Sequence, residues 1–261
     1  MCFDIDSRPP IIPMLGGALD AGPMTLTSAD GTAFSAYASR AANPTGAGVL
    51  ILPDRRGLHA YYEELALRFA EHGLDSVAID YFGRTAGIGN RGADFEFGPH
   101  VGRTRWATLA ADIAAGAAAL RTLRMADEAA SRVFVTGFCM GGRLTFLAGT
   151  LGLDLAGLIG FYGWPTGNAG NGSPAPADVA ADISAPVLAI YGGADEGITK
   201  EARETFDHAL DAAGVERRTV TYPGAPHSFF DRKASQYVEA SAGAWAEVLA
   251  FIGGHGAGVT A

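Results

Sequence analysis

The chain has 261 residues, of which 48% are hydrophobic and 18% charged, with a formal net charge of −9 and two cysteines. This composition supplies a sizeable core and excludes wholesale disorder, and the negative charge disfavours nucleic acid, which is bound by clustered lysine and arginine. Two cysteines exclude a disulfide framework, and no Cys/His cluster has the spacing of zinc ligands.

The sequence has the features of neither a signal peptide nor a membrane span. Residues 1–20 hold acidic residues and prolines instead of the basic start and apolar run of a signal peptide. The longest apolar stretch, 147–164, is interrupted by Asp154 and five glycines, so it fits a helix end, a turn and a buried strand better than a membrane span. We therefore expect a cytoplasmic protein with one domain over residues 1–261, an N-terminal segment at 1–20 and a flexible tail at 253–261.

The first predicted elements are two strands at residues 24–27 and 34–38. They flank Ala29-Asp30-Gly31, and Asp-Gly favours a two-residue hairpin turn. An antiparallel pair is therefore expected to open the fold.

Short apolar runs then alternate with helical patterns. Apolar residues recur every three to four positions in residues 58–69, 106–120 and 238–252, which predicts amphipathic helices. Strands are expected at residues 49–52, 76–79, 133–136, 155–161, 187–191 and 218–222. The alternation predicts an α/β fold whose mostly parallel central sheet is covered by helices on both faces. Two long loops, 81–102 and 165–186, are candidates for function, and neither is long enough to form a separate lid domain.

The strongest motif is Gly137-Phe138-Cys139-Met140-Gly141-Gly142, between a predicted strand and a helical segment. In such a G-x-nucleophile-x-G turn the backbone is strained, and the flanking glycines remove Cβ atoms that would clash. Cys139 would start a helix, whose dipole favours a thiolate, and the Met140 N–H could point at an oxyanion. The alternative is a small buried cysteine in a glycine-rich turn.

Two further candidates follow in the chain order that this fold requires. Asp195, after strand 187–191, is the expected acid, with Glu196 as its local alternative and a solvated turn acid as the non-catalytic reading. His227, after strand 218–222, is the expected base; the remaining histidines are on helical patterns, in the tail or in loops (His72, His208, His255, His59 and His100). His227 would take the thiol proton, Asp195 would orient the imidazole and Cys139 would attack an acyl carbon, with no metal or organic cofactor required.

With these residues assembled, the chain resembles the dienelactone hydrolases (carboxymethylenebutenolidases), α/β-hydrolases with a cysteine nucleophile. The resemblance covers residues 22–253 and rests on the Cys139 motif, Gly192-Gly193-Ala194-Asp195 and His227-Ser228-Phe229-Phe230. It implies that Asp54 matches an acidic residue contacting the cysteine, and that the Arg55 N–H joins that of Met140 in the oxyanion hole. The family usually has glutamate at the position of Asp54.

The resemblance also implies arginines that bind a substrate carboxylate, one of them four residues after the catalytic histidine. That position is Asp231 here, and Arg232 follows it; Arg103 and Arg105 are further candidates, with Arg84 and Arg91 in the same region. The expected substrate is a small ester or lactone that carries a carboxylate and is cleaved through a thioester, by a monomer or homodimer without nucleic-acid or membrane partners. A general carboxylesterase, a thioesterase and a non-catalytic protein that binds a small ligand remain alternatives.

One motif lies outside this scheme. Gly87-Ile88-Gly89-Asn90-Arg91-Gly92 satisfies the dinucleotide-binding pattern G-x-G-x-x-G. That pattern should close a strand and open a helix, whereas here it lies in the middle of a loop. A dinucleotide site is therefore not expected.

Overall fold

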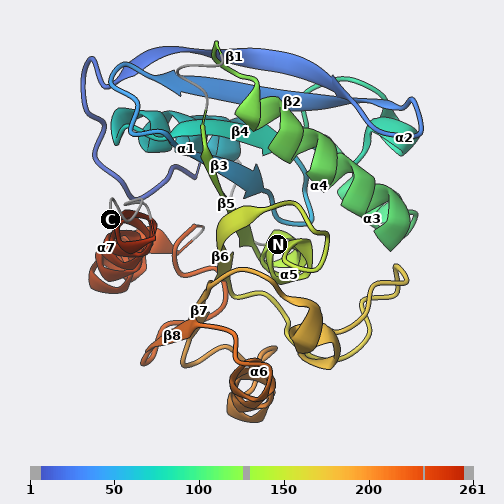
Figure 1. Ribbon diagram of the computed structural model, residues 1–261, viewed down its shortest axis with the longest axis vertical. Coiled ribbons are helices and arrows are strands. Elements are labelled where there is room, and N and C mark those ends of the chain that lie inside the picture. The colour runs from blue at the N-terminus through green and yellow to red at the C-terminus, as the bar shows by residue number, and fades with distance from the viewer. Residues whose placement is uncertain (1–6, 126–129, 232, 256–261) are drawn as a thin grey trace.

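The computed structural model describes residues 7–125, 130–231 and 233–255, in which eight strands form one sheet (Figure 1). The strand order is β1-β2-β4-β3-β5-β6-β7-β8. The strands are β1 (Ala18–Thr27), β2 (Ala33–Ala41), β3 (Ala47–Leu52), β4 (Asp75–Ile79), β5 (Arg132–Phe138), β6 (Leu155–Phe161), β7 (Val187–Gly192) and β8 (Arg217–Tyr222). Strand β2 pairs antiparallel with β1 and β4, and all other pairs are parallel. The predicted α/β fold with a mostly parallel sheet is confirmed.

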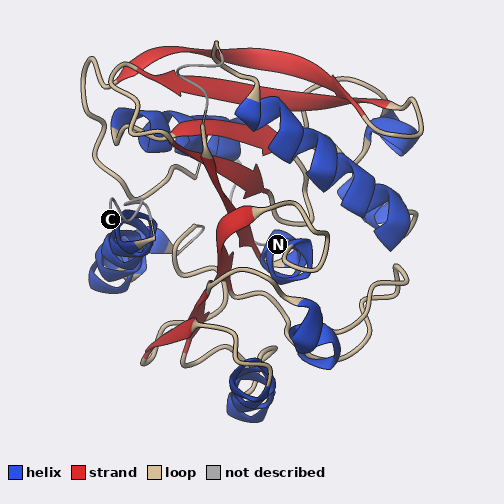
Figure 2. Cartoon of the chain, viewed as in Figure 1, coloured by secondary structure: helices blue, strands red, loops and turns tan. Residues whose placement is uncertain are grey.

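Helices cover both faces of this sheet (Figure 2). The helices are α1 (Ala60–Glu71), α2 (Gly83–Ala86), α3 (Phe97–Val101), α4 (Trp106–Arg121), α5 (Met140–Ala148), α6 (Lys200–Ala212) and α7 (Val238–Gly254), with two 3₁₀ helices, η1 (Pro176–Asp182) and η2 (Ala234–Gln236). Figure 1 shows α1 and α7 on one side and α4 and α5 on the other. Rings of Phe69 and Trp245, 5.0 Å apart, join α1 to α7.

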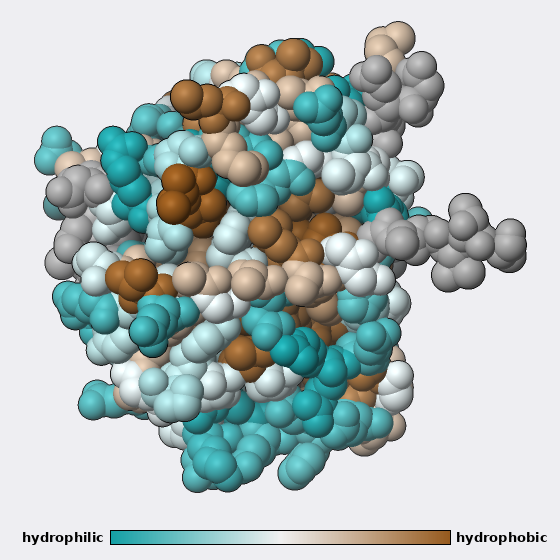
Figure 3. Space-filling view, turned by 90° about the vertical axis from the view of Figure 1, so that its left-hand side faces the viewer, coloured by the Kyte–Doolittle hydropathy of each residue, from teal (hydrophilic) through white to brown (hydrophobic). Residues whose placement is uncertain are grey.

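The parallel strands form the core. Every residue of β3 and β7 is buried, as expected for parallel strands with helices on both faces. Helix α4 approaches closely at Gly116, where a Cβ atom would lie 2.8 Å from Leu50 Cδ1. Figure 3 shows the face that bears α1 and α7: apolar patches are broken up by polar residues, and the end at the level of α6 is polar. No helix in the described residues is long and apolar enough to cross a membrane.

The predicted antiparallel hairpin is present, but the predicted two-residue turn is wrong. Strands β1 and β2 are longer than predicted, and Ser28 N donates to Thr32 O at 2.8 Å, which closes a three-residue loop instead of a two-residue turn. Gly31 in this loop has φ +81°, and Gly31 N donates to Ser28 O at 2.9 Å. A type I turn followed by a left-handed residue fits this geometry, and the left-handed position favours glycine.

Three further segments differ from the sequence-based expectation. The loop at 81–102 contains α2 and α3, and the loop at 165–186 contains η1. Helix α7 continues to Gly254, so Gly253, the predicted start of the tail, is helical. Residues 256–261, and residues 1–6 with Cys2, lie outside the described residues.

The carboxyl ends of the parallel strands meet at one edge of the sheet, because parallel strands all end on the same side. The connections that leave β3, β5, β6, β7 and β8 carry, in that order, Asp54, Cys139, Trp164, Asp195 and His227. Residues scattered over the sequence therefore converge on one region.

Candidate active site

Cys139 occupies the turn between β5 and α5. It is the N-cap residue of α5, with φ 58° and ψ −111°, and it is 2% exposed. Its N–H donates to Phe161 O at 3.0 Å, and Arg143 N donates to Cys139 O at 3.1 Å. A non-glycine residue in such a conformation costs about 1–3 kcal/mol, so the surrounding turn must hold it in place.

The glycines on either side make this turn possible. A Cβ atom on Gly137 would lie 2.2 Å from Gly141 O, and one on Gly141 would lie 2.0 Å from Leu52 O. Both separations are far shorter than the distance at which non-bonded carbon and oxygen atoms touch. Glycine is therefore required at both positions for the turn to pack against itself and against the end of β3.

Asp195 is fixed in the turn that follows β7. Its side chain is 1% exposed, and its Oδ1 accepts hydrogen bonds from Gly197 N at 2.9 Å and Ile198 N at 3.2 Å. Its Oδ2 lies 2.6 Å from Nδ1 of His227. Because an ionised carboxylate only accepts hydrogen bonds, Nδ1 carries the proton, and Nε2 of the neutral imidazole is left as an acceptor. Glu196, the alternative acid, is exposed to solvent.

The imidazole of His227 lies between two aromatic rings. The ring centroid of Tyr162 is 4.8 Å away and that of Trp164 is 4.9 Å away. Trp164 Nε1 in turn donates to Gly197 O at 3.1 Å, which ties this ring to the turn that holds Asp195. The connection that follows β6 therefore positions the histidine together with the acid.

A cavity of about 560 Å³ opens beside the nucleophile turn. It is lined by Arg55, Val101, Gly102, Thr104, Cys139, Met140, Arg143, Leu144, Trp164 and residues 166–171. Trp164 lines this cavity and packs on His227, so it links the imidazole to the cavity wall. A volume of this size suits a small organic ligand.

Asp54 lies next to the nucleophile turn. It is fully buried, its Oδ1 accepts from Arg56 N at 2.8 Å, and its N–H donates to Tyr62 Oη at 2.9 Å. Burial and the neighbouring charges of Asp54, Asp80 and Cys139 raise the pKa of Tyr81 well above its usual value. Tyr81 Oη donates to Pro53 O at 2.7 Å, which holds this ring beside the segment that carries Asp54.

Two backbone amides of the cavity wall belong to residues that the sequence singled out. Over the described ranges, neither Arg55 N–H nor Met140 N–H donates a hydrogen bond to another residue. Met140 is the first residue of α5, where an amide has no partner within the helix. Both residues line the cavity.

Two of the predicted substrate-binding arginines, Arg103 and Arg105, are not in the cavity wall. Arg103 and Arg105 are exposed, and Arg105 Nη1 donates to Gly102 O at 3.3 Å and Thr104 O at 2.8 Å. Arg232 lies outside the described residues. Asp231, at the position of the expected family arginine, is 2% exposed and accepts from Tyr162 Oη at 2.8 Å, so it serves the core and not the cavity.

Arg84 and Arg91 also have other roles. Arg84 Nη1 lies 2.6 Å from Asp112 Oδ2, and Arg91 Nη2 lies 2.9 Å from Asp80 Oδ2. Both acids are fully buried. These two arginines are therefore held in ion pairs that stabilise the fold.

The cations in the cavity wall are Arg55 and Arg143, and sequence reasoning missed the role of Arg143. Its Nη1 donates to the carbonyls of Trp164 and Thr166, each at 3.0 Å, and its Nη2 to those of Gly167 and Pro174, each at 2.8 Å. The sequence held no local signal for this role, because the partners of Arg143 are carbonyls of a separate Gly- and Pro-rich loop. Arg143 anchors the loop that forms one wall of the cavity.

Comparison with known proteins agrees with this geometry. The family model described as the dienelactone hydrolase family matches residues 34–256. The chain belongs to this family. The match makes it a hydrolase family member with the α/β-hydrolase fold and confirms the resemblance seen in the sequence. The matched range contains the nucleophile turn, Asp54, Asp195 and His227.

Individual members of the dienelactone hydrolase family are similar over most of their length. A Salmonella typhimurium protein named "Putative carboxymethylenebutenolidase" is 31% identical over 262 residues, covering 95% of this chain and 92% of that protein. The carboxymethylenebutenolidase of Pseudomonas putida is 26% identical, covering 84% of this chain and 90% of that enzyme. A crystal structure described as "Putative Dienelactone Hydrolase" from Klebsiella pneumoniae superposes with a TM-score of 0.74 at 28% identity, covering 90% of this chain and 99% of that one.

Proposed function

We propose that this family member hydrolyses small esters or lactones, with Cys139 as nucleophile, His227 as general base and Asp195 as the acid that orients the imidazole. The observation that carries the proposal is the 2.6 Å hydrogen bond between His227 Nδ1 and Asp195 Oδ2 beside a cavity lined by Cys139. This bond fixes the tautomer in which Nε2 can accept the thiol proton.

In the acylation step, His227 Nε2 takes the proton of Cys139 Sγ, and the sulfur forms a bond to the acyl carbon. The carbonyl oxygen becomes an oxyanion, which accepts hydrogen bonds from the N–H groups of Met140 and Arg55. When the tetrahedral intermediate collapses, the carbon–oxygen ester bond breaks and the leaving oxygen takes the proton from His227. A thioester to Cys139 remains; with a lactone, the leaving oxygen stays attached to the acyl group.

In the deacylation step, His227 Nε2 accepts a proton from water as the water oxygen attacks the thioester carbon. The same two amides stabilise the second oxyanion, and the thiolate of Cys139 leaves and takes the proton back. The buried carboxylate of Asp54 disfavours a thiolate in the resting enzyme, because two negative charges at close range repel each other. Asp54 thus keeps the thiol of Cys139 protonated until a substrate binds.

We further propose that the substrate carries a carboxylate, and that Arg55 binds it. The Arg55 side chain is exposed at the cavity, and its guanidinium lies over the Phe97 ring, 5.1 Å from the centroid. In the described part of the chain it has no carboxylate partner. The four Arg143 hydrogen bonds to carbonyls leave Arg55 as the cation that can rearrange toward a ligand.

A hydrolysis screen tests the proposal, with lactones, p-nitrophenyl esters and acyl thioesters offered to the wild-type protein and to Cys139→Ala. We expect turnover of an ester or lactone that Cys139→Ala loses by several powers of ten, while its circular dichroism spectrum is unchanged. Preference for acyl thioesters would favour a thioesterase. If the folded variant keeps the activity, or if every substrate is inert, the proposed reaction is wrong.

A further inference from the structure

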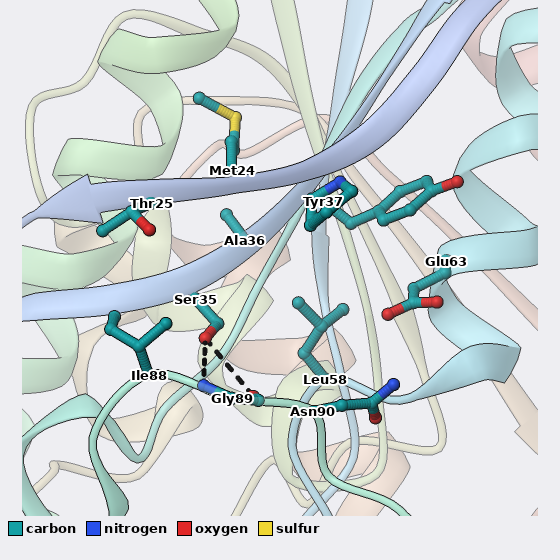
Figure 4. A pocket seen from close by; sticks show the side chains of 11 residues that line it. Met24, Thr25, Ser35, Ala36, Tyr37, Leu58, Glu63, Ile88, Gly89 and Asn90 are labelled. Carbon is teal, nitrogen blue, oxygen red and sulfur yellow. Dashed lines mark hydrogen bonds between the residues drawn. The ribbon is translucent and has the colours of Figure 1, made fainter.

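A second cavity, of about 530 Å³, lies outside the catalytic region (Figure 4). Its wall is built from β1, β2, α1 and the segment that follows α2. The lining residues from β1 and β2 are Pro23, Met24, Thr25, Ser35, Ala36 and Tyr37, and the others are Leu58, Glu63, Ile88, Gly89 and Asn90. No residue is shared with the cavity beside Cys139.

One part of this cavity is apolar and held in place by the surrounding backbone. Leu58 and Ile88 present hydrocarbon to it, and Ile88 is 53% exposed. The segment of Ile88 is fixed, because Ser35 Oγ accepts from Gly89 N at 3.0 Å and donates to Gly89 O at 3.3 Å. An ordered loop therefore holds a large apolar side chain in solvent, where a ligand could cover it.

The opposite part of the cavity is acidic. The side chains of Glu63, from α1, and Tyr37, from β2, lie together on one side of the cavity (Figure 4). In the part of the chain that the structure describes, the Glu63 carboxylate has neither a hydrogen bond nor an ion pair. Burial raises the pKa of Glu63, and burial together with the Glu63 charge raises the pKa of Tyr37.

We propose that this cavity binds a small amphiphilic ammonium compound, with its nitrogen at the Glu63 carboxylate and its hydrocarbon along Leu58 and Ile88. A cation would supply the partner that Glu63 lacks, and the Tyr37 hydroxyl can accept a second N–H bond. An anion would be repelled by Glu63. The Gly-rich segment 87–92 thus contributes an apolar wall to an amine site.

Hexylammonium is a suitable probe, with hexanol as a neutral molecule of similar length and hexanoate as an anion. Binding is followed by methyl and amide NMR shifts in the full-length Cys139→Ala protein, which removes the thiol from the catalytic cavity. We expect saturable shifts at Leu58 and Ile88 with hexylammonium, and much weaker effects with hexanol and hexanoate. Glu63→Gln should weaken hexylammonium binding roughly tenfold, as for a partly exposed charged contact.

Glu64→Gln is the matched control. It removes one carboxylate from the same helix, but Glu64 Oε2 lies 2.7 Å from Arg8 Nη1 and does not line the cavity. It should bind hexylammonium like the parent protein, and Ile88→Ser, which changes an exposed side chain, should weaken binding. Equal binding of hexylammonium and hexanol, unchanged affinity in both Glu63→Gln and Ile88→Ser, or shifts confined to Met140 and Leu144 would overturn the proposal.

Discussion

Asp195 and Glu196 are adjacent in the chain, and only Asp195 is buried against the imidazole of His227. We predict that Asp195→Asn lowers kcat by roughly two to four powers of ten, because an amide nitrogen at Oδ2 would favour the wrong imidazole tautomer. Glu196→Gln should change kcat less than about twofold, since surface substitutions rarely matter. Steady-state hydrolysis of the best ester from the screen measures both. The reverse order would show that Glu196 is the acid.

Arg55 has two separable roles in the proposed mechanism. Its backbone N–H serves the oxyanion, which any residue can do, while its guanidinium serves the substrate carboxylate. We predict that Arg55→Gln lowers kcat/KM for a carboxylate-bearing lactone roughly ten- to hundredfold, the value of one charged hydrogen bond. The methyl ester of that substrate should lose less than about threefold.

Arg103→Gln is the matched control for this comparison, because Arg103 is an exposed arginine outside the cavity wall. It should hydrolyse both substrates like the wild type. If Arg55→Gln lowers kcat/KM equally for the acid and for its methyl ester, the guanidinium does not bind the substrate carboxylate.

At the scale of elements, helix α5 joins the nucleophile to the cavity wall. Cys139 precedes its first residue, and Arg143 holds four carbonyls of the connection that follows β6. We predict that Arg143→Met raises KM roughly tenfold while kcat changes less, because a loosened wall weakens binding more than chemistry. Unfolding in urea should show a loss of about 2–4 kcal/mol from the lost charged hydrogen bonds.

Arg121→Met provides the comparison. Arg121 Nη2 also holds two loop carbonyls, those of Leu153 at 2.6 Å and Asp154 at 2.8 Å, but it does not line the cavity. Arg121→Met should lower the free energy of unfolding and leave KM unchanged. An unaltered KM in Arg143→Met would show that the wall does not depend on this anchor.

The predictable elements were those with a local pattern. Strand β6 has the predicted bounds, because a continuous apolar run marks a buried strand. Strand β8, which is only partly buried, begins one residue before its prediction. Strands β1 and β2 were predicted too short, since their outer ends are exposed and polar, as in the pair of Asp20 and Arg40. The short helices α2 and α3 carry too few residues to show helical periodicity.

The site residues also divide into those with a local sequence motif and those without one. The candidate residues Cys139, Asp195 and His227 could be predicted from sequence because each follows a recognisable strand within a short motif. Trp164 and Arg143 were missed because their roles depend on contacts between separate segments: Trp164 packs on a histidine 63 positions later in the sequence, and Arg143 holds the carbonyl of Pro174. Such contacts are set by tertiary structure and leave no local pattern.

At the scale of the whole molecule, buried His59 couples stability to pH. Burial, aided by the charge of Arg56, lowers the pKa of His59 to about 3, whereas an unfolded histidine has a pKa of about 6.5. Between these values only the unfolded chain binds the proton, so stability from a neutral His59 is complete above pH 6.5 and is lost as pH falls. At pH 5 the loss is about 2 kcal/mol.

His59→Asn removes this titration while keeping the role of His59 as N-cap of α1, because asparagine is a favoured N-cap residue. Urea unfolding at pH 7.5 and pH 5 should therefore show a smaller loss of stability in His59→Asn than in wild type, by about 2 kcal/mol. Identical pH dependence in the two proteins would mean that His59 does not stay neutral in the folded state.

In the proposed mechanism, acyl transfer passes through Cys139. The most direct measurement is acid quenching within the first turnover of p-nitrophenyl acetate, followed by intact-mass and peptide mass spectrometry. We expect one acetyl group per chain, located on Cys139 and released by hydroxylamine as expected for a thioester, and no such adduct in Cys139→Ala. A rapid release of p-nitrophenol with the acetyl group on any other residue, or an equal adduct in Cys139→Ala, would contradict it.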